Sequence, residues 1–127
     1  MNTEKIELRA YHTWMGNDGI ARTMVKPNAE ILLQDAEENT TAVETFYSQK
    51  KFPLLVDLRG IKSISPEARE HFTLKGRDSV VSAYAMVLSS SLSRMIGNFF
   101  MNFHKPAVPA KLFNREDDAV AWLKRFI

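Results

Sequence analysis

The chain has 127 residues, of which 45% are hydrophobic and 25% are charged, so length and composition predict one globular domain over residues 1–127. It contains no cysteine, which excludes disulfide frameworks, thiolate metal sites and cysteine nucleophiles. There are 17 lysine and arginine residues against 15 aspartate and glutamate residues, and a formal charge of +2 gives no reason to expect a nucleic-acid partner.

Two features of the sequence bear on location. No apolar signal-peptide centre precedes the first alternating segment. The longest uncharged run, residues 79–93, contains six serines and is shorter than the roughly 20 apolar residues that a spanning helix needs. We therefore expect a soluble, cytoplasmic protein with no membrane span.

The N-terminal third predicts a β-hairpin followed by a helix. Residues 5–14 alternate with the period of a strand that has one face inward, with Ile6, Leu8, Ala10, His12 and Trp14 on one side. Asn17-Asp18-Gly19 supplies turn residues, and residues 20–25 alternate again, so the two segments are expected to pair. Residues 32–48 carry Ala36, Val43, Phe46 and Tyr47 at helical spacing, although Asn39-Thr40-Thr41 weakens the middle.

The central part predicts two buried strands, each followed by a helix. Residues 52–58 are almost continuously apolar, which is typical of a strand covered on both faces in a parallel or mixed sheet. Ser65 is the expected N-cap of a helix that has Pro66 in its first turn and ends at Gly76. Residues 80–88 predict the second strand, and the helix after it has a wide apolar face. That face consists of Leu92, Met95, Ile96, Phe99, Phe100 and Phe103.

Residues 110–113 predict an edge strand, and Asn114 is the expected N-cap of a last helix, with Glu116 and Asp117 near its positive end. The inner face of that helix would carry Ala119, Val120, Leu123 and Phe126. The fold class is therefore α/β, a single domain with the order β-β-α-β-α-β-α-β-α and a mixed sheet covered by helices.

This order, with Leu55-Val56-Asp57-Leu58-Arg59-Gly60 at the end of the third strand, resembles the STAS-type fold of anti-sigma-factor antagonists in its SpoIIAA-like branch. Four further segments are similar to a group of small, uncharacterised bacterial STAS/SEC14-like proteins. They are residues 26–30, 93–100 and 116–123 and the pair Lys105-Pro106, of which residues 93–100 are the most specific.

The resemblance implies a non-enzymatic regulatory or protein-interaction module. In anti-sigma antagonists the loop after this strand carries an Asp-Ser-Ser-Gly type motif whose serine is phosphorylated by a partner kinase. The corresponding residues here are about Ser63-Ile64-Ser65-Pro66-Glu67, which lack both the Asp-Ser pair and the glycine. SEC14-like relatives imply an alternative, an apolar pocket for a lipid or another hydrophobic ligand.

Polar residues end the two central strands, and ligands tend to bind where the carboxyl ends of neighbouring strands meet. Asp57 and Arg59 end one strand, and Ser89, Ser90 and Ser91 end the other, with Arg94 one turn into the helix. These six residues are the candidate crevice for a ligand or anion. The alternative is structural: a serine caps the helix, while Asp57 and Arg59 pair with each other or cap backbone amides.

The apolar helix over residues 92–103 could fill the core, line a pocket or contact a partner. Core packing is expected for Leu92, Ile96, Phe99 and Phe103. Met101 lies off that stripe, and an exposed apolar patch favours a protein partner or self-association.

No motif predicts catalysis, a metal or a cofactor. The three histidines lack metal-ligand spacing, and neither a Gly-x-Ser-x-Gly elbow nor a glycine-rich phosphate loop occurs among the five glycines. Two main hypotheses remain, beside a third reading, an enzyme acting at the Asp57, Arg59 and Ser89 crevice, which would need an acid–base pair that the sequence does not display. The first is a docking module that uses Ser63, Ser65, Glu67 and Arg69, where phosphate on Ser65 would sit at a helix N-terminus. The second is a protein that binds a small amphiphile under the 92–103 helix, with Arg94 or the serines at its polar end.

Overall fold

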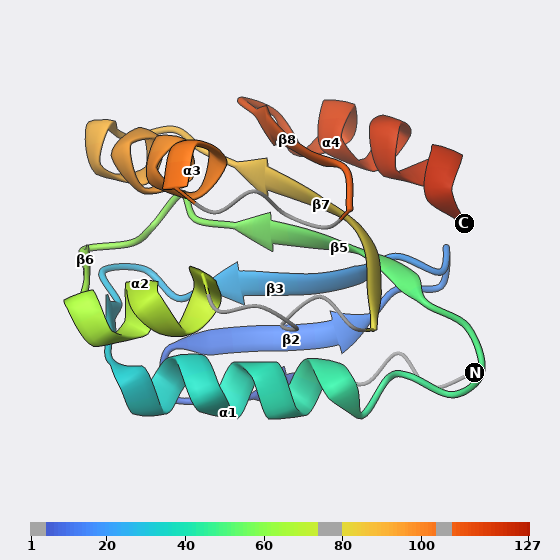
Figure 1. The fold of residues 1–127 in the computed structure, drawn as a ribbon, viewed down its shortest axis with the longest axis horizontal. Helices are drawn as coiled ribbons and strands as arrows, with labels where there is room; N and C mark the ends of the chain where they lie inside the picture. The colour runs from blue at the N-terminus through green and yellow to red at the C-terminus, as the bar shows by residue number, and fades with distance from the viewer. Residues whose placement is uncertain (1–4, 74–79, 104–107) are drawn as a thin grey trace.

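A computed structural model describes residues 5–73, 80–103 and 108–127 and shows a sheet with helices on both faces (Figure 1). The six-stranded sheet has the order β1-β2-β3-β5-β7-β8. Its strands are β1 (Ile6–Glu7), β2 (Tyr11–Met15), β3 (Ala21–Val25), β5 (Phe52–Asp57), β7 (Val81–Val87) and β8 (Ala110–Phe113). The pairs β1–β2 and β2–β3 are antiparallel, and β3, β5, β7 and β8 are parallel. The predicted mixed sheet is confirmed.

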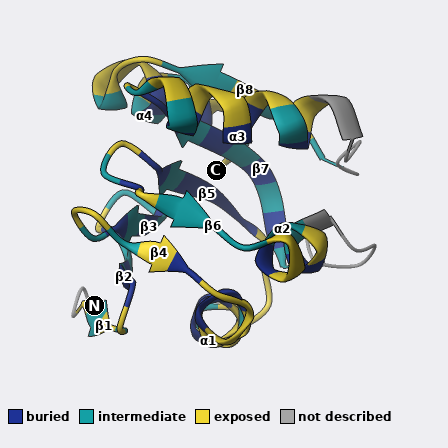
Figure 2. Ribbon diagram, turned by 90° about the vertical axis from the view of Figure 1, so that its left-hand side faces the viewer, coloured by how far each residue is buried: buried dark blue, intermediate teal, exposed yellow. Residues whose placement is uncertain are grey.

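Two layers of helices bury the two faces of the sheet. On one face lie α1 (Leu33–Glu44), α2 (Pro66–Thr73) and α3 (Ser91–Phe103), which share a core cluster with β2, β3 and the end of β5. On the other face α4 (Glu116–Leu123) packs on β5 and β7 and continues into a 3-10 turn, η1 (Lys124–Phe126). Figure 2 shows buried residues concentrated where these helices meet the strands. The central strands β5 and β7 are therefore covered on both sides, as the apolar run over residues 52–58 indicates.

A second, two-stranded sheet joins segments that the sequence left as loops. β4 (Glu30–Ile31) pairs in parallel with β6 (Ser63–Ile64). Asn28 precedes β4 with a positive φ of 61°, and its N–H donates to the Gly60 carbonyl at 2.7 Å. The loop after β5 is thereby tied to the segment before α1.

The predicted first strand over residues 5–14 is wrong, because this segment is itself a hairpin. The chain reverses where the Leu8 N–H donates to the Tyr11 carbonyl at 2.8 Å, and β1 folds back on β2 with Ile6 opposite Thr13. The expected inward face is also reversed along β2. Tyr11 and Thr13 are buried under α1, whereas His12 and Trp14 are partly exposed. Alternation of hydrophobicity continues through a tight reversal and does not reveal it.

The hairpin predicted around Asn17-Asp18-Gly19 is confirmed by the antiparallel pairing of β2 with β3. Gly19 has a φ of +84°, and the Gly16 N–H donates to the Ile20 carbonyl at 2.9 Å to close the turn. The cap of α2 is confirmed as well, since Ser65 Oγ accepts the Ala68 N–H at 3.1 Å directly before Pro66. Gly76, the predicted end of α2, and the Lys105-Pro106 pair lie outside the described residues.

Helix boundaries differ from prediction in two places. The helix α1 ends at Glu44, so Phe46 and Tyr47 lie beyond it, and Tyr47 is exposed. The N-cap of α4 is Arg115 rather than Asn114, because Asn114 Oδ1 accepts a hydrogen bond from Arg94 at 2.7 Å.

The helix α3 largely packs as predicted. Ile96 is buried in the core cluster, with Leu92 and Phe99 packed against it. Phe100 is buried as well, whereas Met95 is 62% exposed, so the apolar face is narrower than expected. Met101 is exposed, as its place off the stripe predicts, and the side chain of Phe103 lies outside the described part of the chain.

Candidate functional site

Asp57 and Arg59, at the carboxyl end of β5, pair with each other. Asp57 Oδ1 accepts the backbone N–H and the Nε–H of Arg59, both at 3.0 Å, and Oδ2 accepts from a terminal nitrogen of Arg59 at 2.8 Å. The Asp57 side chain is only 8% exposed, whereas that of Arg59 is 41% exposed. A second carboxylate, Glu116 at the start of α4, lies 3.4 Å from Arg59. Asp57 thus caps its own loop, as the structural alternative predicts.

The serines at the carboxyl end of β7 form a reciprocal helix cap. Ser90 Oγ accepts the Ser93 N–H at 3.0 Å, and Ser93 Oγ accepts the N–H groups of Ser89 and Ser90 at 3.0 and 2.9 Å. Ser93 is completely buried, while Ser91 is exposed at the first helical position. Ser93 therefore accepts two of the hydrogen bonds that cap α3, and sequence reasoning did not single it out. The spacing Ser-x-x-Ser at a helix start is the signal that could have found it.

The structure brings the two predicted strand ends together. Ser89 Oγ donates to the Arg59 carbonyl at 3.5 Å, which joins the β5 and β7 ends of the crevice. Arg94 turns to Asn114 instead, as described above. The first turn of α4 adds Glu116, Asp117 and Asp118 to this edge of the sheet. Both arginines of the crevice, Arg59 and Arg94, already hydrogen-bond to side chains of the protein. The acidic first turn of α4 would repel an anion bound there.

The candidate docking residues lie on the loop before α2 and on its first turns. Ser63 belongs to β6, and the Ser65 side chain is used as the helix cap. Glu67 is exposed, whereas Arg69 points toward α3, with its guanidinium carbon 5.4 Å from the centre of the Phe99 ring. Arg69 Nε is buried without a hydrogen-bond partner in the described part of the structure.

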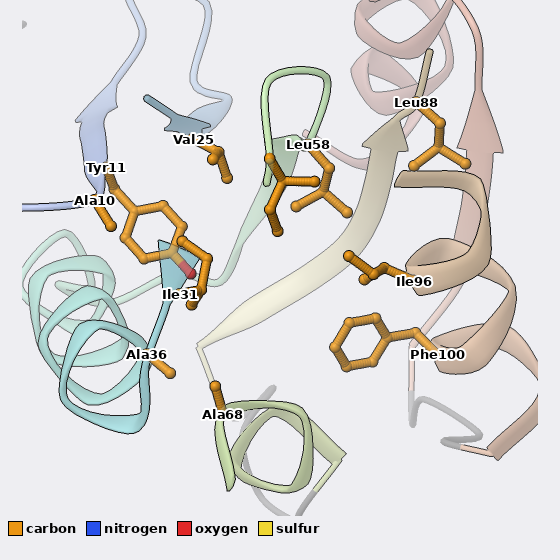
Figure 3. Close-up of a cluster of buried hydrophobic side chains, with 11 residues drawn as sticks. Ala10, Tyr11, Val25, Ile31, Ala36, Leu58, Ala68, Leu88, Ile96 and Phe100 are labelled. Carbon is orange, nitrogen blue, oxygen red and sulfur yellow. The ribbon is translucent and has the colours of Figure 1, made fainter. Parts of the chain in front are cut away.

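A cavity of about 120 Å³ lies between the sheet and the layer formed by α1, α2 and α3. The sheet contributes Leu54 and Val56 from β5 and Tyr84 and Met86 from β7, and the helices contribute mainly Val43, Phe72, Ile96 and Phe100. Figure 3 shows Ile96 and Phe100 of α3 on one side of this region, facing Tyr11 and Ile31 on the other. Val56, Tyr84 and Met86 are only partly buried although their strands are central, because their side chains face this cavity.

The wall of the cavity includes a few polar side chains. Asn39 of α1 donates from Nδ2 to Thr23 Oγ1 at 3.3 Å, and Thr40 Oγ1 lies 2.9 Å from His71 Nε2. Asn39 Oδ1 is buried and has no partner among the described residues. Tyr11 also lines the cavity, and burial raises the pKa of its hydroxyl above the ordinary value.

The predicted pocket under the 92–103 helix is thus present as a cavity, but its polar groups come from other elements. Arg94 and the serines face the outer edge of the sheet, whereas Asn39 and Thr40 belong to α1. A signal existed for Asn39, since Ala36, Asn39 and Val43 share one helix face and all three are buried. A polar residue in the middle of an apolar helix face indicates a buried partner or a site.

Among residues 5–73, 80–103 and 108–127, no group of three His, Asp or Glu side chains could hold a metal ion. No helix within these ranges is long and apolar enough to cross a membrane.

Comparisons with known proteins support the fold. The structure is similar to that of an uncharacterized protein of the DUF3478 family from Shewanella loihica PV-4, which is described as having a SpoIIAA-like fold. The TM-score is 0.64 at 17% sequence identity, and the match covers 90% of this chain and 92% of that one. The predicted SpoIIAA-like, STAS-type fold is therefore confirmed.

A protein with unknown function from Arthrobacter sp. FB24 is 30% identical over 87% of this chain and 96% of that one, with a TM-score of 0.34. A search of curated proteins gave no match. The model of a domain of unknown function, DUF7793, matches residues 13–127. The chain belongs to the DUF7793 family and has a SpoIIAA-like fold.

Proposed function

We propose that the protein is a non-enzymatic binding protein that holds a small amphiphile in the cavity between α1, α2, α3 and the sheet. The observation that carries this proposal is the cavity itself, about 120 Å³ with a mostly apolar wall. An engineered apolar cavity of about 150 Å³ is known to bind benzene. The volume therefore suits one ring or a short alkyl segment and is too small for a whole membrane lipid.

The energetics favour an occupant. A cavity with a mainly apolar wall leaves apolar surface in contact with water, and a ligand that covers this surface contributes about 25 cal/mol per Å² to binding. A ligand that fills the space adds contacts to side chains that line it, such as Val56, Phe72 and Phe100. Close packing is the general state of protein interiors, and a void of this size in a chain this small is consistent with a binding site.

The test uses purified full-length protein and a variant that fills the cavity. Native mass spectrometry, with solvent extraction of the same sample, reports a ligand carried from the host. Titration with benzene or toluene reports binding through the thermal midpoint. A ligand at one hundred times its Kd stabilises by about 2.7 kcal/mol, which raises Tm by about 10 °C for a domain of this size.

Val56→Phe places a ring inside the cavity and is expected to abolish this rise. Met95→Phe is the matched control, because Met95 is exposed on α3 and outside the cavity wall. A clean unliganded mass, together with no shift of Tm for wild type with either probe, would refute the proposal.

A second candidate function, docking on a protein partner through α2, is favoured by Arg69. Its buried Nε lacks a partner in the described residues, and an unsatisfied buried donor is costly. A partner that displaces the side chains covering this nitrogen could supply a carboxylate as the acceptor, with Glu67 and Ser63 at the rim. This surface corresponds to the one that the STAS resemblance implies for docking.

Affinity purification from the native host tests this second function, with Arg69→Glu and Ser65→Glu compared with Arg125→Glu. Arg125 is exposed at the C-terminal end, away from α2. The docking function predicts one protein that is retained by wild type and Arg125→Glu and lost with Arg69→Glu. Identical captured proteins for all variants would exclude it.

A further inference from the structure

The wall of the cavity contains a tyrosine that is almost completely covered by protein. Tyr11 is the first residue of β2 and is 3% exposed. Figure 3 shows its ring extending from the strand into the buried cluster, with the hydroxyl beside Ile31, and both residues line the cavity. The hydroxyl of a tyrosine in such a position usually has a hydrogen-bond partner.

The Tyr11 hydroxyl has no such partner. Within residues 5–73, 80–103 and 108–127 it forms no hydrogen bond, whereas Thr13, two positions along the same strand, bonds to the Arg22 carbonyl at 2.8 Å. The nearest charged group that acts on the Tyr11 hydroxyl is the Asp35 carboxylate. Asp35 accepts instead from the Arg9 side chain and from the Leu32 N–H.

The Tyr11 oxygen is accessible from the cavity. In the described part of the chain, the unpartnered side-chain atoms that a water molecule cannot touch are Asn39 Oδ1 and Arg69 Nε. The Tyr11 oxygen is unpartnered as well but is not one of these sealed atoms, so it retains surface that a water molecule can touch. Because Tyr11 lines the cavity and is buried from the outside, this surface faces the interior of the cavity.

The chemistry of a phenol decides which group suits this position. A tyrosine hydroxyl can donate one hydrogen bond and can also accept, but it is the better donor because the ring withdraws electron density from the oxygen. A ligand that displaces water from the cavity loses affinity if it cannot reproduce the hydrogen bond of that water. A ligand with an acceptor next to Tyr11 avoids this loss, and a hydrocarbon does not.

We propose that the Tyr11 hydroxyl is the polar anchor of the cavity and donates to a small apolar ligand that carries a hydrogen-bond acceptor, such as a carbonyl oxygen or a ring nitrogen. The apolar remainder of the ligand packs on wall residues such as Val56 and Phe100. This inference rests on the proposed function, since it specifies the ligand of the same cavity.

The experiment compares pyridine with benzene in wild type and in two variants. The two probes are rings of equal size, and pyridine adds one acceptor nitrogen. Tyr11→Phe removes only the hydroxyl. Tyr47→Phe is the matched control, because Tyr47 is 43% exposed and lies outside the cavity wall. Dissociation constants are measured by NMR titration of labelled full-length protein at pH 8, where pyridine is neutral.

Tyr11→Phe should weaken the binding of pyridine at least about fivefold, a factor that corresponds to about 1 kcal/mol, and should change the binding of benzene less than about twofold. Tyr47→Phe should leave both dissociation constants unchanged. The thermal midpoint of unliganded Tyr11→Phe should stay near that of wild type, since the hydroxyl has no partner to lose among the described residues.

A second readout needs only the wild-type protein. The Cζ atom of tyrosine carries the hydroxyl, and its carbon-13 resonance responds to hydrogen bonding of that group. Pyridine should shift the Tyr11 Cζ resonance more than benzene does, while the Tyr47 resonance stays in place. If Tyr11→Phe does not fold, this comparison decides alone.

Equal loss of pyridine and benzene binding in Tyr11→Phe, or no loss of either, would overturn this inference. In wild type, equal shifts of the Tyr11 Cζ resonance with the two probes would do the same. As long as benzene binds to wild type, the proposed function stands in each of these cases. If neither probe binds to wild type, the inference and the proposed function both fail.

Discussion

At the scale of single residues, the buried carboxylates of Asp57 and Asp35 each pair with an arginine side chain. Asp57 receives three N–H groups from Arg59, two positions along the chain, while Asp35 of α1 pairs with Arg9 and accepts the Leu32 N–H. Burial tends to raise the pKa of the Asp35 carboxyl, but its bonds to Arg9 and Leu32 outweigh this and leave the pKa below its ordinary value. Such carboxylates stabilise the fold as anions.

Replacing Asp57 tests its role as a structural residue. Asp57→Ala removes three hydrogen bonds to a charged acceptor and should lower the free energy of unfolding by about 2 kcal/mol. The control is Glu116→Ala, which removes a longer and more exposed contact to the same arginine and should change stability by less than about 0.5 kcal/mol. Urea denaturation measures both. Equal losses in the two variants would contradict this assignment.

The lowered pKa of Asp18 predicts that the protein loses stability in acid. The Arg22 guanidinium hydrogen-bonds its carboxylate and lowers its pKa from 3.8 to about 2. The folded pKa lies below the unfolded one, so the stabilisation is complete above pH 4 and disappears as the pH falls through about 2. The side chain is 30% exposed, and solvent screening reduces the effect to about 1 kcal/mol.

Urea denaturation at pH 7, 4 and 2.5 should show that Asp18→Asn loses less stability on acidification than wild type. Asp117→Asn, an exposed aspartate on α4, is the control and should follow the wild-type curve. A wild-type slope in the Asp18→Asn variant would exclude this ion pair as a source of the pH dependence.

At the scale of elements, the starts of α2 and α3 are set by serine side chains. Ser65 caps α2 with one hydrogen bond, whereas Ser90 and Ser93 cap α3 reciprocally. Gly97, one turn further along α3, permits close approach to the sheet, since a Cβ there would lie 2.9 Å from Leu88 and 3.2 Å from Leu112. The cap and this contact together place α3 over one side of the cavity.

Ser93→Ala should destabilise the protein by about 1–2 kcal/mol, because two amides at the entry to α3 lose their acceptor in a buried position. Ser91→Ala is the matched control. It changes the same residue type two positions earlier, at an exposed site, and should have an effect near zero. Thermal denaturation followed by circular dichroism measures both. A larger loss for Ser91→Ala would show that the exposed serine has a role beyond the cap.

At the scale of the whole molecule, the two central parallel strands are expected to be the most stable part of the sheet. β5 and β7 are covered by helices on both faces, whereas β1 has two residues and lies at the edge of the sheet. β4 and β6 also have two residues each and pair only with one another among the described residues. Stability is therefore expected to differ across the fold.

Amide hydrogen exchange should reveal this gradient. The amides of β5 and β7 are expected to exchange only through global unfolding, and those of β1 and the β4–β6 pair at least about 100-fold faster through local opening. The comparison is made in the EX2 regime, in which the measured exchange rate of an amide is proportional to its intrinsic chemical exchange rate. Protection of β1 equal to that of β5 would contradict the proposed order.

The periodicity of the sequence was enough to predict those strands and helices whose local pattern agrees with their tertiary environment. The 52–58 and 80–88 segments are buried strands because their apolar runs suit a sheet covered on both faces. The hairpin at residues 17–19 and the cap at Ser65 follow from the conformational preferences of a few adjacent residues. These interactions span only a few positions, and a linear sequence contains all the information they need.

The polar assignments could be predicted only in part. Asp57, Arg59 and Ser90 were placed correctly at neighbouring strand ends, and their structural alternative was stated, because the parallel topology dictates that those ends meet. The chain reversal at residues 8–10 was missed, since the alternation of residues 5–14 is compatible with either one strand or two. The same error put Tyr11 and Thr13 on the wrong face of the sheet.

The sequence by itself determined the order of the main strands and helices and the covered central strands, because these depend on hydrophobic period and on short-range turn and cap chemistry. The SpoIIAA-like fold was predicted from a resemblance to known proteins. Only the tertiary structure decided where the polar end of the cavity lies. Tyr11, Thr23 and Asn39 come from two strands and a helix, and they line the same cavity only once these elements are packed. The volume of the cavity is likewise a small difference between large packed volumes, and no local pattern encodes it.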